Sequence, residues 1–237
     1  MSSDPATLRP LFSALEIIDQ FVAQWQDSFI DQLACQRRCS VCCTDRVTVT
    51  EAEAARILAF SQPEALSQQH LRKQIPSPVT TNEFAYACLH GVDLEAADFS
   101  ELPSACPFLT NAMECTVYQV RPLMCRLFIS TVPCKEGGEA IIQEGIFLTQ
   151  IVLQQLTEHI SQGTKWGNLI TMLRYCSSPD ASGFEDLRVC REIPGFPLSP
   201  QEKKELAPRL QPLFDRLKSR AWLEEGFSLD FAGVIYP

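Results

Sequence analysis

Cysteines are the residues of this 237-residue chain best suited to chemistry, and eleven are present. Eight of them fall into two groups along the sequence. The first group holds four cysteines within nine residues, Cys35, Cys39, Cys42 and Cys43, and the second is spread more widely, over Cys106, Cys115, Cys125 and Cys134. Cysteine thiolates are the usual ligands of structural zinc and of iron–sulfur clusters. Because free thiols at this density would be prone to oxidation, we predict that all eight are metal ligands.

The compartment bears on this interpretation. Residues 1–5 show neither the basic region nor the apolar region of a secretory signal, so we expect a cytoplasmic protein in a reducing environment. Clustered cysteines in that compartment favour metal binding over disulfides. Cys176 and Cys190 stand apart from the two groups, and we interpret them as small buried apolar residues.

The spacing leaves the kind of metal open between two alternatives. Cys42 and Cys43 are adjacent and must point in different directions, which is unfavourable for a single tetrahedral ion. The Cys106-Pro107 step is similar to the end of bacterial ferredoxin motifs. These features favour an iron–sulfur cluster, with zinc as the alternative.

Basic and aromatic residues accompany the cysteines. Four thiolates on a zinc ion or a [4Fe–4S] core leave a net charge of about −2. We expect arginines next to the cysteines to offset it, namely Arg37, Arg38, Arg121 and Arg126. Phe108, Tyr118 and Phe128 are expected to form a dry shell around the sulfurs.

Three histidines are present. His90 follows Cys88 by two residues and is a weaker candidate for a metal site, whereas His159 is expected at the surface of a helix.

The two cysteine groups resemble a known family. The run from Cys39 to Cys43, followed by CPFL, CTVY and RPLMCRLF, is similar to the CxxCxxCC cysteine-cluster family, or YkgJ-like group, described as a zinc- or iron-chelating domain. The resemblance covers about residues 35–134. It matches at Cys106, Cys115, Tyr118, Arg121, Pro122, Cys125, Arg126 and Phe128. Cys35 departs from the pattern, because it lies one residue further from Cys39 than the family spacing requires.

Two classes of function follow from a metal in this chain. In the first class the metal does redox or Lewis-acid work, as in an iron–sulfur oxidoreductase. Flagellin lysine-N-methylases carry a similar cysteine cluster, but the chain has no glycine-rich nucleotide loop for S-adenosylmethionine. In the second class a zinc ion stabilises a module that binds a protein partner. The absence of any substrate-handling motif slightly favours the second class.

Charge and hydropathy exclude other classes. The formal net charge is −9 and no basic stripe is visible, so we expect no nucleic-acid partner. The most apolar stretches, 8–33 and 146–156, are interrupted by polar residues well before the ~20 residues that a membrane span requires.

Hydrophobic periodicity predicts a mainly α fold, a helical domain with irregular cysteine-rich metal-binding loops. Helices are expected over 8–33, from a Thr50–Glu53 capping box to residue 60, from Pro63 to 74, over 144–160 and 164–175, and after a capping box at Ser199–Glu202. The last helix should kink near Pro208 or Pro212. One short strand is expected over 84–89, and turns at 135–139.

These elements suggest three regions. Residues 1–34 form an N-terminal amphipathic helix, residues 35–134 the cysteine-cluster region, and residues 135–237 a C-terminal helical region that packs on the same core.

Overall fold

The computed structural model describes residues 5–61, 75–95, 102–134 and 140–218. These residues are mainly helical, as predicted. The helices are α1 Pro5–Asp27, α2 Glu51–Phe60, α3 Thr81–His90, α4 Leu123–Leu127, α5 Glu144–Ile160, α6 Leu169–Ser177 and α7 Pro200–Lys218. Short 3-10 turns occupy η1 Ile30–Gln32 and η4 Tyr118–Val120, and the strands are β1 Thr48–Thr50, β2 Lys165–Asn168 and β3 Arg188–Val189.

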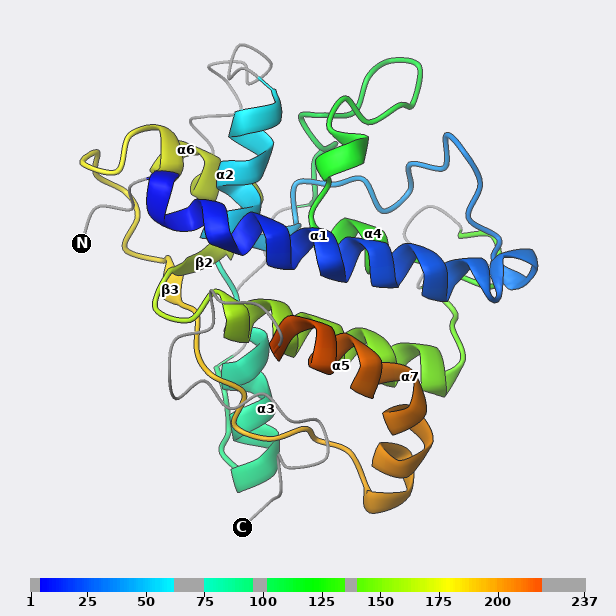
Figure 1. Cartoon of the computed structure of the whole chain (residues 1–237). Coiled ribbons are helices and arrows are strands. Elements are labelled where there is room, and N and C mark those ends of the chain that lie inside the picture. The colour runs from blue at the N-terminus through cyan, green and yellow to red at the C-terminus, as the bar shows by residue number, and fades with distance from the viewer. Residues whose placement is uncertain (1–4, 62–74, 96–101, 135–139, 219–237) are drawn as a thin grey trace.

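The first hydrophobic core is formed by α1, α5 and α7. Apolar residues at helical spacing on α1, such as Ile18, Val22 and Trp25, pack with Leu153 and Leu156 of α5 and with Phe214 of α7. Figure 1 shows α1 and α5 running across the molecule with α7 beside α5. The predicted helix over 8–33 ends earlier than expected, at Asp27, and the 3-10 turn η1 follows it.

The predicted helix after Ser199 is confirmed as α7. Ser199 Oγ accepts from Glu202 N at 3.3 Å, and the Glu202 carboxylate accepts from Ser199 N at 2.5 Å, which completes the capping box. Pro208 and Pro212 both lie inside this helix. Figure 1 shows α7 changing direction along its length, as expected where a proline removes a backbone hydrogen bond.

The second core lies between α2, α6 and a small antiparallel sheet of order β1-β2-β3. The register pairs Thr48 with Asn168 and Lys165 with Val189. The prediction of a helix from residue 164 was therefore wrong at its start. Residues 165–168 are extended and pair with β1, and Asn168 Oδ1 then caps α6 by accepting from Ile170 N at 3.0 Å.

The prediction of a strand over 84–89 was also wrong, because these residues belong to α3. A second capping box explains the helix: Thr80 Oγ1 accepts from Glu83 N at 3.1 Å and Glu83 accepts from Thr80 N at 3.0 Å. Gly91 ends the helix in the left-handed conformation at φ 62°. The Thr80–Glu83 pair was the signal that the pattern-based interpretation overlooked. The predicted helix from Pro63, the turns at 135–139 and His70 lie outside the described residues.

Candidate metal centre

The first cysteine group lies on a chain of turns between η1 and β1. Two of these turns close on cysteine amides, since Cys39 N donates to Gln36 O and Cys43 N donates to Ser40 O, each at 2.9 Å. Arg38, inside the first turn, has a φ of 72°, in the left-handed region that non-glycine residues seldom adopt.

Backbone pairing brings the second group to the first. Thr44 and Ala105 form an isolated antiparallel bridge, and Cys106 N donates to Cys43 O at 3.0 Å. Asp45 extends the pairing, because its amide donates to Ser104 O and its carboxylate accepts from Ser104 N at 3.0 Å. Cys43 and Cys106 are thereby placed next to each other although 63 positions separate them in the sequence.

A tight loop then returns the chain to the same place. Leu109 and Cys115 form a second isolated bridge, and Thr116 N donates to Phe108 O at 2.9 Å. Met113, at the tip of this loop, has a φ of 59°. The loop therefore brings Cys115 back towards Cys106.

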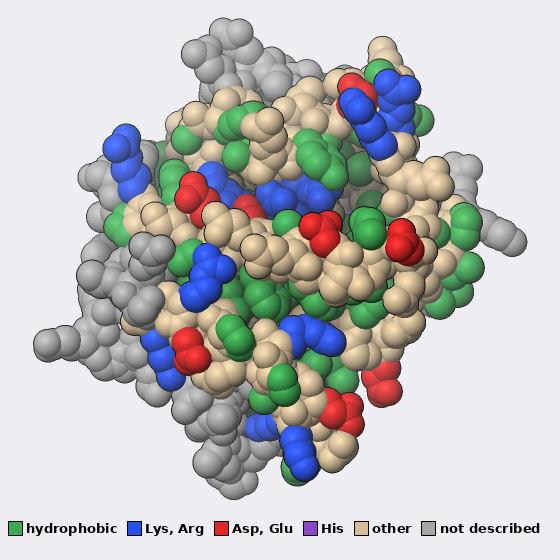
Figure 2. Space-filling model, turned by 45° about the vertical axis from the view of Figure 1, so that its right-hand side comes forward, with side chains coloured by type: hydrophobic (Ala, Val, Ile, Leu, Met, Phe, Trp, Pro, Cys, Tyr) green, Lys and Arg blue, Asp and Glu red, His purple; other side chains and the backbone are tan. Residues whose placement is uncertain are grey.

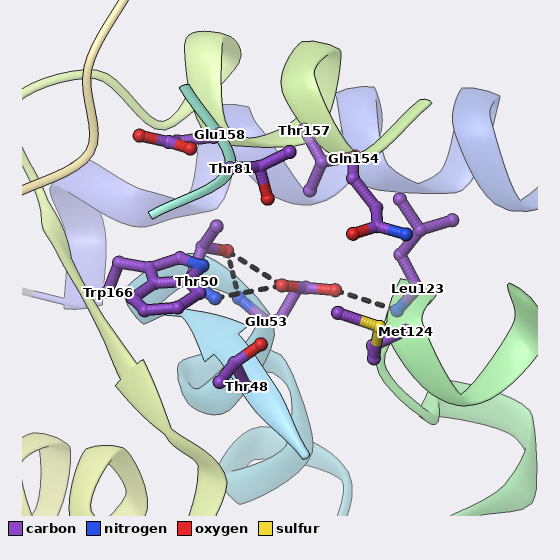
Figure 3. A pocket seen from close by; sticks show the side chains of 10 residues that line it. All are labelled: Thr48, Thr50, Glu53, Thr81, Leu123, Met124, Gln154, Thr157, Glu158 and Trp166. Atoms are coloured by element: carbon purple, nitrogen blue, oxygen red, sulfur yellow. Dashed lines mark hydrogen bonds between the residues drawn. The ribbon is translucent and has the colours of Figure 1, made fainter. Parts of the chain in front are cut away.

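Cys125 reaches the same region from α4, and a buried carboxylate fixes that helix. Glu53 Oε1 accepts from Leu123 N at 2.8 Å, while Glu53 Oε2 accepts from Thr50 N at 2.9 Å in the predicted capping box. Figure 3 shows the Glu53 carboxylate between Thr50 and the start of α4, in a small pocket that Glu158 and Trp166 also line. The sequence marked Glu53 as a cap but gave no sign of its link to α4.

An ion-pair network holds the other side of α4. Arg126 Nε lies 2.8 Å from Asp19 Oδ1 on α1, and Arg56 Nη1 lies 2.9 Å from Asp19 Oδ2. Arg126 Nη2 also donates to Gln119 O at 2.7 Å. Figure 2 shows basic side chains gathered in a hollow of one face, with acidic side chains beside them. Arg126 was predicted to offset thiolate charge, but it forms an ion pair with Asp19 instead.

We call Cys43, Cys106, Cys115 and Cys125 the inner group. The last three pack against the second hydrophobic core. Burial raises the pKa of Cys106 to about 11, and burial followed by the neighbouring Cys106 and Cys115 thiols raises the pKa of Cys125. A hydrogen bond from the Cys42 thiol lowers the pKa of Cys43. The four thiols are close enough to influence one another's ionisation.

We call Cys35, Cys39 and Cys134 the outer group. These cysteines line a cavity of about 380 Å³ together with Arg37 and Arg38. Cys35 packs against the first hydrophobic core rather than the second, and Ser130 N donates to its sulfur at 3.3 Å. Burial raises the pKa of Cys35, and the charges of Cys39, Cys134 and Cys42 raise it further. Cys42 raises the pKa of Cys125 as well, so it influences a thiol of each group.

Of the four predicted arginines, Arg121 influences the ionisation of the thiols. Its charge lowers the pKa values of Cys42, Cys115 and Cys125 against the larger effects that raise them. Its guanidinium carbon lies 3.9 Å from the centroid of the Tyr118 ring. Its buried Nε has no hydrogen-bond partner among the described residues. Arg37 and Arg38 pair with Glu114 at the surface, at 3.2 and 3.3 Å.

The expected aromatic shell is present only in part. Phe108 is buried beside the inner group, whereas Tyr118 is 58% exposed and Phe128 is 41% exposed. Tyr118 turns its ring to Arg121 instead.

The remaining cysteines and histidines lie elsewhere. Cys190 is buried, in agreement with its interpretation as an apolar residue, and Cys176 is half-buried on α6. Cys88 and His90 lie on α3, where His90 Nδ1 is 2.8 Å from Tyr86 O and its ring stacks on Tyr86. The expectation that His159 is a surface residue was wrong: it is buried, and its Nδ1 accepts from Ile193 N at 3.2 Å.

The cysteine thiols of the two groups are chemically suited to a thiophilic metal, but their side chains are not arranged as in a metal-bound site. Among the described residues, no three Cys, His, Asp or Glu side chains could hold one metal ion as they stand. A cysteine side chain has a single torsion before its sulfur, so rotation between staggered positions is the adjustment that binding requires. The unpaired Nε of Arg121 is a donor suited to a metal-bound thiolate.

Comparison with known families agrees with the resemblance seen in the sequence. Residues 34–147 match the model of the CxxCxxCC family, whose description reads "Putative zinc- or iron-chelating domain". The chain is therefore similar to this metal-chelating family over residues 34–147. Comparisons with curated proteins and with solved structures gave no match. In the part of the chain that the structure describes, no helix is long and apolar enough to cross a membrane.

Proposed function

We propose that this protein binds a metal cofactor through the inner group, with Cys43, Cys106, Cys115 and Cys125 as ligands, and that the cofactor is an iron–sulfur cluster. The observation that carries the proposal is the convergence of these thiols from separate segments. Backbone pairing joins Cys43 to Cys106, a loop returns Cys115, and α4 delivers Cys125. Four cysteines is the number that both [4Fe–4S] clusters and structural zinc sites take.

The surroundings suit bound thiolates. Burial makes the inner thiols reluctant to ionise in the absence of metal, and coordination replaces their protons with a cation. Arg121 supplies a positive charge on the same side, and Phe108 and Val117 keep that side apolar. An iron–sulfur cluster would supply one-electron redox or Lewis-acid chemistry.

Zinc is the second candidate. The inner group offers four thiols without Cys42, so the adjacency of Cys42 and Cys43 no longer counts against a single tetrahedral ion. Under this alternative the ion would stabilise the loops from 35 to 125 and support a surface for a protein partner. A cytoplasmic location, which we also propose, would keep the thiols reduced for either metal.

Single substitutions test the ligand assignment. We expect Cys106→Ser and Cys125→Ser each to lower the metal content of the full chain, purified without oxygen, to well below that of the unaltered chain. Cys88→Ser is the matched control, because Cys88 is exposed on α3 and belongs to neither group. Unchanged iron and zinc contents in both inner-group variants would refute the assignment.

A further inference from the structure

Three arginines gather around one carboxylate where α1, α2 and α4 meet. Asp19 of α1 uses both oxygens on two of them, since Oδ1 lies 2.8 Å from Arg126 Nε and Oδ2 lies 2.9 Å from Arg56 Nη1. Burial raises the pKa of Asp19, and the charges of Arg56, Arg126 and Arg121 lower it. We call Arg56, Arg121 and Arg126 the arginine cluster.

The arginine cluster carries more positive charge than the carboxylates beside it neutralise. Its three guanidinium groups are protonated at neutral pH, and Asp19 supplies at most one negative charge. Glu53 is the other carboxylate on which the charge of Arg56 acts, and its oxygens already accept from Thr50 N and Leu123 N. Before metal is bound, the net charge is therefore about +1 with Glu53 ionised and about +2 with Glu53 neutral.

Hydrogen-bond donors in the cluster are still open. The Nε atoms of Arg56 and Arg121 are buried and have no hydrogen-bond partner among the described residues. Buried donors are nearly always paired in native proteins, so these two N–H groups point to an acceptor supplied by a ligand. A guanidinium group has five N–H donors, so Arg121 can serve the thiols and a second acceptor together.

The arginine cluster can be reached from solvent. Figure 2 shows a hollow lined by basic side chains. The side chains of Asp19 and Arg126 keep 18% and 13% of their surface exposed. The guanidinium carbon of Arg121 lies 3.9 Å from the centroid of the Tyr118 ring, and Tyr118 is an exposed residue. A small anion therefore has access to the cluster.

We propose that the arginine cluster binds phosphate, either as the free ion or as the phosphate group of a small molecule. Guanidinium groups bind phosphate oxygens through paired, charge-assisted hydrogen bonds, and a dianion suits the excess positive charge. Because the charge of Arg121 acts on both Asp19 and Cys125, the anion lies next to the inner group. This inference goes beyond the proposed function, since the cysteines take no part in holding the anion.

Calorimetric titration of the full chain, purified without oxygen, with inorganic phosphate tests the site. Chloride keeps the ionic strength constant, so that screening does not change during the titration. We expect saturable binding of about one phosphate per chain, weakened about tenfold or more in Arg56→Gln and in Arg121→Gln. Arg209→Gln removes the same charge from α7, where Arg209 Nη1 donates to Thr149 Oγ1, and should leave phosphate binding unchanged.

The absence of saturable binding to the unaltered chain overturns the site, as does equal weakening in Arg209→Gln. If Arg56→Gln does not fold, Arg121→Gln serves alone, because Arg121 is half-buried and forms no ion pair among the described residues. Titration with methyl phosphate distinguishes the two sources of the ligand. Binding of methyl phosphate as well supports a site for phosphate esters, and binding of inorganic phosphate alone supports a site for the free ion.

The variant Cys106→Ser separates this inference from the proposed function. It should lose the inner metal and bind phosphate at least as tightly as the unaltered chain, because thiolates on a metal no longer oppose the charge of Arg121. Phosphate binding that disappears together with the metal would show that the metal holds the anion, and would overturn the inference. If the unaltered chain holds no metal but binds phosphate through the arginines, the proposed function fails and this inference stands.

Discussion

At the scale of single residues, the adjacent cysteines Cys42 and Cys43 have different surroundings. The hydrogen bond between their thiols raises the pKa of Cys42 and lowers that of Cys43. The charges of Cys106, Cys125 and Cys115 raise the pKa of Cys43, whereas Cys42 raises the pKa of Cys35 and also that of Cys125. The sequence showed that the two side chains must diverge, but not which group each would join.

This difference gives a prediction for the inner metal. Cys43→Ala should release most of it, and Cys42→Ala, an otherwise identical change one residue away, should retain it, because the backbone hydrogen bond from Cys106 N to Cys43 O places Cys43 beside the inner group. Elemental analysis of the two variants, purified side by side without oxygen, checks this. Equal losses from both would show that Cys42 is an inner ligand as well.

A buried histidine gives a prediction for pH dependence. Burial lowers the pKa of His159 to about 4 from its ordinary value of 6.5. The folded state therefore binds fewer protons than the unfolded state between these values, so stability is present above pH 6.5 and is lost as the pH falls towards 4. Each pKa unit corresponds to about 1.4 kcal/mol, so the loss from His159 approaches about 3 kcal/mol.

His159→Asn keeps an acceptor for Ile193 N but does not titrate. Denaturant unfolding at pH 7 and pH 4.5 should show a free energy of unfolding that falls by about 2 kcal/mol less in the variant than in the unaltered chain. An identical fall in both proteins would mean that His159 is not the group responsible.

At the scale of elements, capping signals and hydrophobic spacing predicted α1, α2, α5 and α7, since these helices follow local rules. The strand β2 could not be predicted in the same way. Its four residues, Lys165–Asn168, are extended because they pair with β1, more than a hundred positions earlier in the sequence. Likewise, the cysteines were identified by spacing, but their division into two groups depends on the pairing of Cys43 with Cys106.

Glu53 links two elements, and its replacement should affect both. Glu53→Gln leaves either Leu123 N or Thr50 N facing an amide group instead of a carboxylate oxygen, so we expect a loss of about 1–3 kcal/mol in stability. Because α4 carries Cys125, the inner metal should also be released faster by a chelator. Thermal unfolding and metal-release rates measure the two effects.

Glu83→Gln is the matched control for that change. Glu83 holds the same position in the capping box of α3, which carries none of the inner cysteines. Its replacement should cost about 1 kcal/mol and leave the release of metal unchanged. If both variants release metal alike, Glu53 does not position α4.

Two glycines in different elements make a further matched pair. A Cβ on Gly167 in β2 would contact the Leu187 side chain and Ser77 Oγ too closely, so Gly167→Ala should destabilise the chain by about 1–3 kcal/mol. A Cβ on Gly145 in α5 meets nothing within 4 Å, and Gly145→Ala should stabilise it by up to about 1 kcal/mol. Denaturant unfolding that gives shifts of the same sign would contradict this packing.

At the scale of the whole molecule, the two hydrophobic cores contact different cysteines. The core of α1, α5 and α7 includes Phe196, Leu210 and Phe214, and Cys35 is the cysteine that packs on it. The other core has Cys106, Cys115 and Cys125 at its edge. The division of the chain at residues 34 and 134 stays a prediction, although α1 shares its core with the later helices.

Removal of the metal should therefore affect the two hydrophobic cores to different extents. Amide hydrogen exchange after chelation should rise in residues 102–126 and at the start of α2, and should change less in α1 and α5, because their core contains none of the inner cysteines. A uniform rise across both cores would show that the metal stabilises the whole fold.

The metal centre is tested most directly by the content of iron, zinc and acid-labile sulfide in the full chain purified without oxygen. We expect iron with a matching amount of sulfide, lost when Cys106 and Cys125 are replaced and kept when Cys88 is replaced. Zinc without sulfide, lost in the same variants, would show that the inner group binds a zinc ion instead of an iron–sulfur cluster. A folded chain that holds neither metal in stoichiometric amount would show that the inner group is not a metal centre.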